Sequence, residues 1–320
     1  MITACCLPWV RWAGRLLALA GLLVLSACTS LPGAVNGVVG RLDATPRMAI
    51  ISAFEPELVE LLPQVEGART HRLHGVDFTT GTLAGKPVVL FLSGISMTNA
   101  TMNTQRALDH FNVSHIVFSG IAGGVNPSLN IGDVVVAAQW GQYLEVLMAR
   151  EVTPGRYTAP DWMQAELTLP AFGMMHPRPV EVRSAAQPRI QRHFWFPVDA
   201  QMLRVASGLT AVQLARCQGN ACLSHTPRVQ VGGNGVSGQA FVDNKVYREY
   251  VFNTFGANVL DMETAATAMV AHSNGVPYIA FRSLSDLAGG GEGANEMATF
   301  MGLAASNSAR VLIAFLRAWP

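Results

Sequence analysis

The most informative run in the chain is Val113-Ser-His-Ile-Val-Phe-Ser-Gly-Ile-Ala-Gly-Gly124. Its first half is short, apolar and β-branched, as in a strand that is covered on both faces. Its second half, from Gly120 to Gly124, predicts a tight turn whose backbone can approach a ligand or bind an anion, and a purely structural turn is the alternative. The run is neither a dinucleotide-binding fingerprint nor a P-loop, because it lacks the G-x-G-x-x-G spacing and a following Lys-Ser/Thr.

The same order of strand, small-residue turn and helix recurs on both sides of this run. It predicts an α/β fold with a mostly parallel sheet covered by helices on both faces. In such sheets, ligands bind at the carboxyl ends of the strands. The expected strands are 48–53, 86–92, 113–118, 133–138 and 278–282, and the expected helices are 57–65, 99–111, 265–272 and 294–317.

Composition narrows the class of protein. The chain has 320 residues, is 50% hydrophobic and 13% charged, and carries a formal net charge of +1. The apolar content excludes a disordered chain, and the balanced charge argues against nucleic acid as a partner. Residues 141–228 hold few clean strand patterns and are predicted to be an insertion of loops and short helices. Strand patterns resume at Val229, so we expect one domain over 47–320 that includes this insertion.

The N-terminus has the pattern of an export signal. A basic start, an apolar run and the sequence Leu25-Ser-Ala-Cys28 resemble a bacterial lipoprotein signal, with a signal peptide over 1–27 and a lipidated Cys28. An uncleaved membrane anchor and an ordinary signal peptide are the alternatives. Residues 28–46 are rich in small residues and are expected to tether the domain to the membrane. Thr29, rather than Asp, after the cysteine favours the outer membrane, with the domain facing the periplasm.

Two further cysteines lie close together in the insertion. Cys217 and Cys222 can form a disulfide in an oxidising compartment, where so short a loop would contribute roughly 2 kcal/mol. Metal binding is the competing interpretation, but further Cys or clustered His residues are absent nearby. We therefore expect a disulfide and no metal site.

Carboxylates follow several of the predicted strands. Glu57 comes after the first strand, Glu263 lies in Asp261-Met-Glu263 at a helix start, and Asp286 ends a buried strand. Helix capping for the first two, and an Asx turn for the third, are the structural alternatives. A partly desolvated Asp286 would have a raised pKa and could act as an acid. The esterase motif Gly-x-Ser-x-Gly and the zinc-protease motif His-Glu-x-x-His are both absent.

Taken together and in this order, the motifs resemble the nucleoside phosphorylase and nucleosidase superfamily. They look most like the 5′-methylthioadenosine/S-adenosylhomocysteine nucleosidase branch, and the insertion looks like that of plant bark-storage-protein relatives. The resemblance covers roughly residues 47–318 apart from the insertion. The motifs are Phe54-Glu-Pro-Glu57, Ser119-Gly-Ile-Ala-Gly-Gly-Val-Asn-Pro127, Gly132-Asp-Val-Val, Ser237-Gly-Gln-Ala-Phe241, Met262-Glu-Thr-Ala-Ala and Arg282-Ser-Leu-Ser-Asp286.

The resemblance implies a catalytic role for three of these residues. Glu57 matches the base that activates water, with Arg282 close by. Asp286 matches the acid that protonates the purine at N7. An acid at the base and a carboxylate at the sugar would stabilise the charges that develop as an N-glycosidic bond breaks.

The resemblance also implies a substrate site. Glu263 matches the carboxylate that binds the ribose hydroxyls, next to Met262. Phe241 matches the aromatic ring that stacks on the base, and Val242 would offer its backbone to the base edge. The strand end that contains Ile121, Ala122 and Gly123 belongs to the same substrate site.

The fold that the resemblance implies is a three-layer αβα sandwich around a mixed, partly barrel-like sheet, usually in a homodimer. The expected reaction is hydrolysis of a purine nucleoside or 5′-thio-nucleoside, with no metal or organic cofactor. A phosphate-dependent phosphorylase and a non-catalytic nucleoside-binding or storage lipoprotein are the alternatives. Because S-adenosylhomocysteine is a cytoplasmic metabolite, the predicted export suggests salvage of nucleosides that reach the periplasm.

Overall fold

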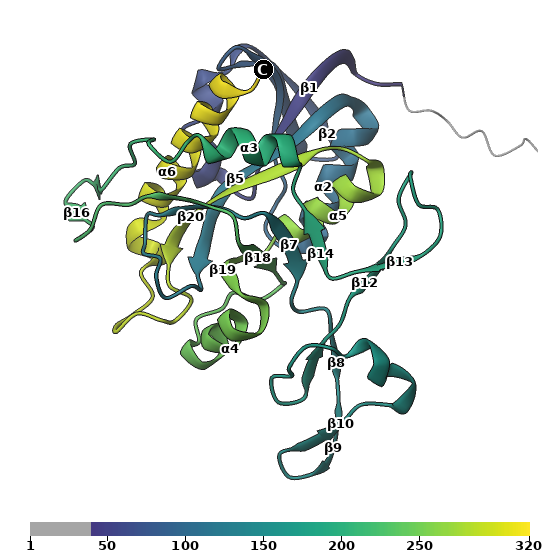
Figure 1. Ribbon diagram of the computed structural model, residues 1–320. Coiled ribbons are helices and arrows are strands. Elements are labelled where there is room, and N and C mark those ends of the chain that lie inside the picture. The colour runs from purple at the N-terminus through teal and green to yellow at the C-terminus, as the bar shows by residue number, and fades with distance from the viewer. Residues whose placement is uncertain (1–39) are drawn as a thin grey trace, which may run out of the picture. The chain divides into compact units, whose positions relative to one another are not determined.

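The computed structural model describes residues 40–320 (Figure 1). The predicted signal peptide (1–27), Cys28 and the tether up to residue 39 lie outside the described residues. Strand β1 (Asp43–Ser52) begins inside the stretch that was predicted to be a tether, 28–46. The last residues of that stretch are therefore part of the sheet.

The main sheet runs through residues 40–320 in the order β14-β7-β18-β19-β5-β1-β4-β3-β2, with β20 beside β5, and with β6 joining β20 to β17. The mixed α/β architecture of the predicted fold is confirmed. Besides β1, its strands are β2 (Glu66–Leu73), β3 (Val76–Leu83), β4 (Lys86–Leu92), β5 (Phe111–Gly124), β6 (Val134–Val136), β7 (Gln139–Gln142), β14 (Trp195–Pro197), β17 (Val229–Val231), β18 (Asn234–Ser237), β19 (Ala257–Asp261) and β20 (Tyr278–Asp286).

Strand β5 is where the sheet divides. Along most of its length it pairs in parallel with β1 and β20, and near its end Gly123 and Gly124 pair antiparallel with β19. The prediction of a tight turn over Gly120 to Gly124 is wrong, because the neighbouring strands continue the ladder through these residues. Gly120, Gly123 and Gly124 do not have a positive φ, so the backbone conformation does not require glycine here. Their lack of a side chain instead leaves room for neighbouring side chains that pack against the strand.

Helices cover both faces of the sheet. Helices α2 and α5 pack together on one face, and α6, with α1 and α3, lies on the other (Figure 1). The side chains of β1 show this division, because Ala49 and Ile51 belong to the first core cluster while Met48 and Ile50 belong to the second. The helices are α1 (Glu55–Leu58), η1 (Leu62–Gln64), α2 (Met97–His110), η2 (Asp161–Glu166), α3 (Ala200–Ser207), α4 (Lys245–Phe255), α5 (Thr264–Asn274) and α6 (Met297–Ala318).

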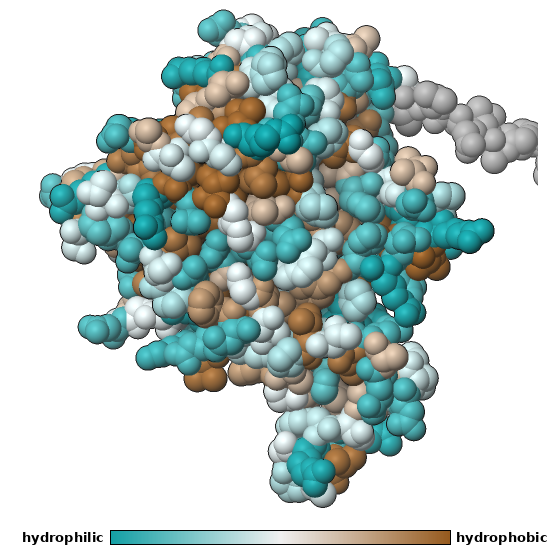
Figure 2. All heavy atoms as spheres, in the orientation of Figure 1, coloured by the Kyte–Doolittle hydropathy of each residue, from teal (hydrophilic) through white to brown (hydrophobic). Residues whose placement is uncertain are grey.

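Helix α6 is a core helix. It is long and apolar enough to cross a membrane, but 67% of its most apolar window is buried. It packs against β20 and β5. Figure 2 shows apolar side chains gathered around α3, where Val205, Val212 and Leu214 pack against the core cluster that also contains the buried face of α6.

Two segments differ from the predicted elements near the N-terminus. The helix expected over 57–65 is instead the short α1 followed by the 3-10 turn η1. Pro63 explains this break, because a proline cannot continue a helix whose preceding turn it would clash with. The hairpin β2–β3 was not predicted. Most of the side chains of β2 are exposed and polar, so it lacks the apolar alternation that identifies a strand.

The insertion has more strands than predicted. It joins the main sheet at β7, where it begins, and through β14, which pairs antiparallel with β7. Cys217 and Cys222 form a disulfide that closes the β15–β16 hairpin. The small strands are β8 (Val146–Met148), β9 (Arg150–Thr153), β10 (Arg156–Thr158), β11 (Met175–Pro177), β12 (Val180–Val182), β13 (Gln191–His193), β15 (Cys217–Gln218) and β16 (Ala221–Cys222).

An aromatic contact joins the insertion to helix α4. The ring of Phe172 lies 4.9 Å from that of Tyr247 and 5.1 Å from that of Tyr250, centroid to centroid. The Tyr250 hydroxyl donates a hydrogen bond to the Pro170 carbonyl at 2.8 Å. The insertion therefore supports α4, which directly follows the loop that contains Phe241.

Candidate active site

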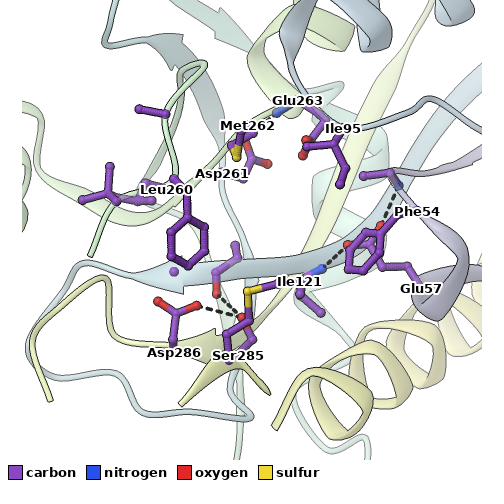
Figure 3. A pocket seen from close by; sticks show the side chains of 17 residues that line it. Phe54, Glu57, Ile95, Ile121, Leu260, Asp261, Met262, Glu263, Ser285 and Asp286 are labelled. Atoms are coloured by element: carbon purple, nitrogen blue, oxygen red, sulfur yellow. Dashed lines mark hydrogen bonds between the residues drawn. The ribbon is translucent and has the colours of Figure 1, made fainter. Parts of the chain in front are cut away.

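A cavity of about 330 Å³ lies where β1, β5, β19 and β20 end (Figure 3). The loop after β18 and the start of α6 complete its wall. All of the sequence-predicted catalytic and substrate-binding residues except Arg282 line it. The lining residues are Ala53, Phe54, Glu57, Ile95, Ile121, Ala122, Gly123, Ala240, Phe241, Val242, Leu260, Asp261, Met262, Glu263, Ser285, Asp286 and Met297.

Glu57 lies at the start of α1 and is 2% exposed. Its Oε2 accepts a hydrogen bond from the amide of Ala53 at 2.5 Å, and its Oε1 accepts one from the amide of Ile121 at 2.7 Å. Burial raises the pKa of the Glu57 carboxyl to about 7, against Arg282 and these amides, which favour the ionised form. A carboxyl with this pKa exchanges protons near neutral pH, as a general base requires.

Arg282 lies beneath the cavity floor and is 1% exposed. Its Nε is 2.7 Å from Asp261 Oδ2, its Nη1 donates to the Ile121 carbonyl at 3.0 Å, and its Nη2 donates to Glu263 Oε2 at 3.2 Å. Its Nη1 is also 3.7 Å from Glu57 Oε1. The guanidinium thus links three carboxylates from two segments of the chain, and Arg282 acts on the cavity through its neighbours.

Asp261 and Glu263 divide two tasks between them. Asp261 accepts hydrogen bonds from the amides of Glu263 and Thr264 and from the hydroxyls of Ser237 and Thr264, so the capping interpretation applies to Asp261. Glu263 Oε1 instead accepts from the amide of Ser96 at 2.9 Å. Burial raises the pKa of Glu263 against the attraction of Arg282. Asp261 and Glu263 both line the cavity, but they have different partners. Asp261 caps the start of α5, whereas the carboxylate of Glu263 is held by Ser96 and Arg282, which lie outside that helix.

Asp286 ends β20 on another side of the cavity from Glu57 (Figure 3). Its Oδ1 accepts from the amide of Ala288 at 2.8 Å, and its Oδ2 accepts from the Ser285 hydroxyl at 2.9 Å. The first bond forms the Asx turn that was the structural alternative. Burial also raises the pKa of Asp286, against both of these bonds. The side chain therefore combines the turn with the properties of a proton donor.

The remaining predicted residues form the apolar walls. Phe241 lines the cavity and is 56% exposed, so part of this side chain is accessible to a ligand. Val242 is buried beside it, and Met262 lies between the two acidic residues. The sequence did not single out Ile95 or Met297. Ile95 follows the end of β4, a position that could have identified it, whereas Met297 enters the cavity from a distant helix.

Gly120 is the point where the strand allows the buried charges to meet. A Cβ atom on Gly120 would lie 2.5 Å from Arg282 Nη1 and closer still to Glu57 Oε1. We expect Gly120→Ala to lower kcat/KM by about 100-fold or more, because the new Cβ would displace Glu57 and Arg282, and to lower stability by about 1–3 kcal/mol.

An activity assay and urea unfolding measure these two effects of Gly120→Ala. Gly208→Ala is the matched control, because its Cβ meets a carbonyl at 3.4 Å, an ordinary contact. Normal activity in Gly120→Ala would show that the position of Glu57 is unimportant.

Within residues 40–320, no group of three or more His, Cys, Asp or Glu side chains could hold a metal ion.

The sequence matches the phosphorylase superfamily over residues 47–317, and the chain belongs to this family. A 5′-methylthioadenosine/S-adenosylhomocysteine nucleosidase of Tolumonas auensis is 29% identical over 272 residues, which cover 85% of this chain and 99% of that protein. A nucleosidase of the same name from Bacillus thuringiensis is 30% identical over 244 residues, 76% of this chain and 87% of that protein.

A solved structure shares the fold. The 5′-methylthioadenosine/S-adenosylhomocysteine nucleosidase of S. pneumoniae, with a transition-state inhibitor, superimposes with a TM-score of 0.62 at 25% identity. The match covers 86% of this chain and 100% of that chain. The sequence-based assignment to the nucleoside phosphorylase and nucleosidase superfamily is therefore confirmed.

Proposed function

We propose that the protein hydrolyses the N-glycosidic bond of a purine nucleoside and releases free base and sugar. The observation that carries this proposal is that Glu57, Glu263 and Asp286 line one cavity from three segments of the chain, and that burial raises the pKa of each (Figure 3). Breaking this bond builds positive charge on the sugar and negative charge on the base. Carboxylates near the sugar and an acid near the base stabilise both charges.

Each group then has one role in the reaction. Glu57 takes a proton from water as the water oxygen bonds to C1′ of the sugar. The bond from C1′ to the base breaks, its electron pair goes to the base, and N7 takes the proton of Asp286. Glu263 accepts hydrogen bonds from the 2′ and 3′ hydroxyls, while Phe241 stacks on the base. Water attacks the face opposite the base, as in an inverting glycosidase.

The charges of the site favour water over phosphate as the nucleophile. Three carboxylates, Glu57, Asp261 and Glu263, surround the single guanidinium of Arg282. That guanidinium is already bound on Nε, Nη1 and Nη2 and is almost fully buried, so it has no free edge for a phosphate. A phosphate at this place would lie next to unbalanced negative charge.

The wall next to Glu57 suggests an apolar 5′ substituent. Phe54, Ile121 and Met297 belong to one hydrophobic cluster there. Such a surface binds a methylthio group better than a hydroxyl, which would lose its hydrogen bonds to water. The relatives named above are nucleosidases of 5′-methylthioadenosine and S-adenosylhomocysteine. We therefore place 5′-methylthioadenosine ahead of plain nucleosides, although the predicted export favours the plain ones.

Base release from adenosine, inosine and 5′-methylthioadenosine tests the proposal, with each substrate measured with and without phosphate. We expect release without phosphate, and fastest release from 5′-methylthioadenosine. Release only with phosphate would make the protein a phosphorylase. Saturable binding without release would make it a nucleoside-binding or storage protein. Cleavage of plain nucleosides alone would support periplasmic salvage and contradict the proposed role of the apolar wall.

The site of action is part of the same proposal. We propose that Cys28 is lipidated, that the domain faces the periplasm from the outer membrane, and that two copies form a homodimer. The signal pattern supports the first two statements, and the family resemblance supports the third. Labelled palmitate should enter the protein but not a Cys28→Ser variant, and light scattering after size exclusion should give twice the chain mass.

A further inference from the structure

Two residues of the cavity region have a backbone conformation that side chains rarely adopt. Within residues 40–320, the non-glycine residues with positive φ are His74, Ala84, Ser96 and Ala288. His74 and Ala84 each precede a glycine with positive φ in a two-residue hairpin turn, where this conformation is normal. Ala288 likewise precedes a glycine of positive φ, in a turn that the Gly290 amide closes on the Leu287 carbonyl at 2.9 Å, whereas Ser96 has no such turn to explain it.

Both of these amides point at carboxylates of the cavity. The amide of Ala288 donates to Asp286, and the amide of Ser96 donates to Glu263 Oε1 at 2.9 Å. Ser96 is the more unusual residue, since its φ of 85° and ψ of 151° belong to a region that is used almost only by glycine. Strained residues of this kind persist where the surrounding contacts hold them, and they cluster at functional sites.

The Ser96 side chain makes a second contact in the opposite direction. Its hydroxyl donates to Gln239 Oε1 at 3.1 Å, and the Thr98 hydroxyl donates to the same oxygen at 3.3 Å. Gln239 directly precedes the cavity residues Ala240 and Phe241. One residue therefore joins the carboxylate of the sugar end to the loop of the base end.

The contacts of Glu263 show what this bond does for the sugar site. Its Oε1 accepts from Ser96, and its Oε2 accepts from Arg282 at 3.2 Å. Each oxygen of a carboxylate can accept about two hydrogen bonds, so each keeps one free position. Fixed partners on both oxygens set the plane of the carboxylate, and therefore the direction in which those free positions point.

We propose that Ser96 is a positioning residue for sugar recognition. Its strained backbone aims the amide at Glu263, and its hydroxyl ties the loop of Phe241 to the same point. The two hydroxyls of a ribose are then recognised together with closure of the loop over the base. This inference rests on the proposed function, because it assigns Ser96 to the sugar end of that same site.

Ser96→Gly separates this role from a structural one. Glycine adopts the observed φ and ψ without strain and keeps the amide, but it removes the bond to Gln239 and frees the backbone to move. We expect Ser96→Gly to unfold at the same temperature as the wild type or a higher one, with kcat/KM lowered by about tenfold. We also expect the preference for adenosine over 2′-deoxyadenosine to fall by about tenfold, since a mobile Glu263 discriminates less between them.

Two further variants complete the design. Ala84→Gly relaxes another residue of positive φ in the β3–β4 turn, away from the cavity, and should leave the sugar preference unchanged. Gln239→Ala keeps Ser96 but removes the acceptor of its hydroxyl, and should lower kcat/KM in the same direction as Ser96→Gly.

The outcomes distinguish this inference from the proposed function. If the wild type cleaves nucleosides and Ser96→Gly keeps the sugar preference within about twofold, the role of Ser96 is wrong. If the wild type releases no base, calorimetric Kd values for adenosine and 2′-deoxyadenosine replace kcat/KM, and the same loss of preference is expected. A wild type that binds neither of these nucleosides nor 5′-methylthioadenosine would overturn both proposals.

Discussion

Asp286→Asn should lower kcat/KM for 5′-methylthioadenosine by about 10²- to 10⁴-fold, the range for loss of a general acid. An asparagine can accept from the amide of Ala288 with its Oδ1 and donate from its Nδ2 to the Ser285 hydroxyl oxygen, but it cannot give a proton to N7 of the departing base. The substitution therefore removes the chemistry and leaves most of the shape. Release of adenine at fixed pH measures the change.

A substrate with a better leaving group tests the assigned role of Asp286. In 4-nitrophenyl riboside the leaving group is 4-nitrophenolate, a stabilised anion that needs no protonation. Asp286→Asn should therefore cleave this substrate at nearly the wild-type rate. Asp133→Asn is the matched control, because Asp133 is also buried, accepts a backbone amide at 2.8 Å and lies outside the cavity. An equal loss of rate on both substrates would mean that Asp286 shapes the pocket and does not protonate the base.

The pH dependence of wild-type activity follows from the two raised pKa values. Glu57 must be ionised to accept a proton from water, and its raised pKa of about 7 moves this ionisation into the neutral range. Asp286 must be protonated, and its raised pKa extends the pH range in which it holds a proton. We expect a bell-shaped profile whose two limbs report the coupled pair.

The predicted catalytic residues share a position that the sequence can reveal. Glu57 and Asp286 each follow an apolar strand, and parallel strands bring their carboxyl ends to one edge of the sheet. The order of the motifs along the chain also produced the resemblance to the nucleoside phosphorylase and nucleosidase superfamily. The cavity therefore contains the predicted set except Arg282, even though the run from Gly120 to Gly124 proved to be strand.

Other features depended on contacts between distant segments. The bond from Ser96 to Glu263 spans 167 residues, and its geometry requires a backbone conformation that the residue type argues against. Local patterns carry no signal for such a contact. The β2–β3 hairpin was missed for a different reason, because an exposed edge hairpin needs little apolar sequence. The sequence thus predicted the acidic residues of the cavity, but not Ser96, which positions Glu263, or the β2–β3 hairpin.

Glu57→Gln should lower kcat/KM by about 10³-fold, and on both substrates, because the attacking water is needed whatever the leaving group. Glutamine fills the same space, but its single oxygen can accept from only one of the two amides, Ala53 or Ile121, and it takes no proton. If Glu57→Gln loses activity on 4-nitrophenyl riboside while Asp286→Asn keeps it, the two results distinguish the general base from the general acid. Glu60→Gln, three residues along and bonded to Ser306, is the control that should keep full activity.

Glu57→Gln should also become more stable relative to the wild type as the pH becomes alkaline. The folded pKa of Glu57 is about 7 against an ordinary 4.5, so its proton favours the folded state. That contribution is fully present below pH 4.5 and is lost as pH rises through about 7, in total about 3 kcal/mol. Glu57→Gln cannot ionise and loses nothing. Its free energy of unfolding in urea, relative to wild type, should therefore rise between pH 5 and pH 9. A pH-independent difference would show that Glu57 ionises normally, and the carboxyl would then lack the raised pKa on which its role as base depends.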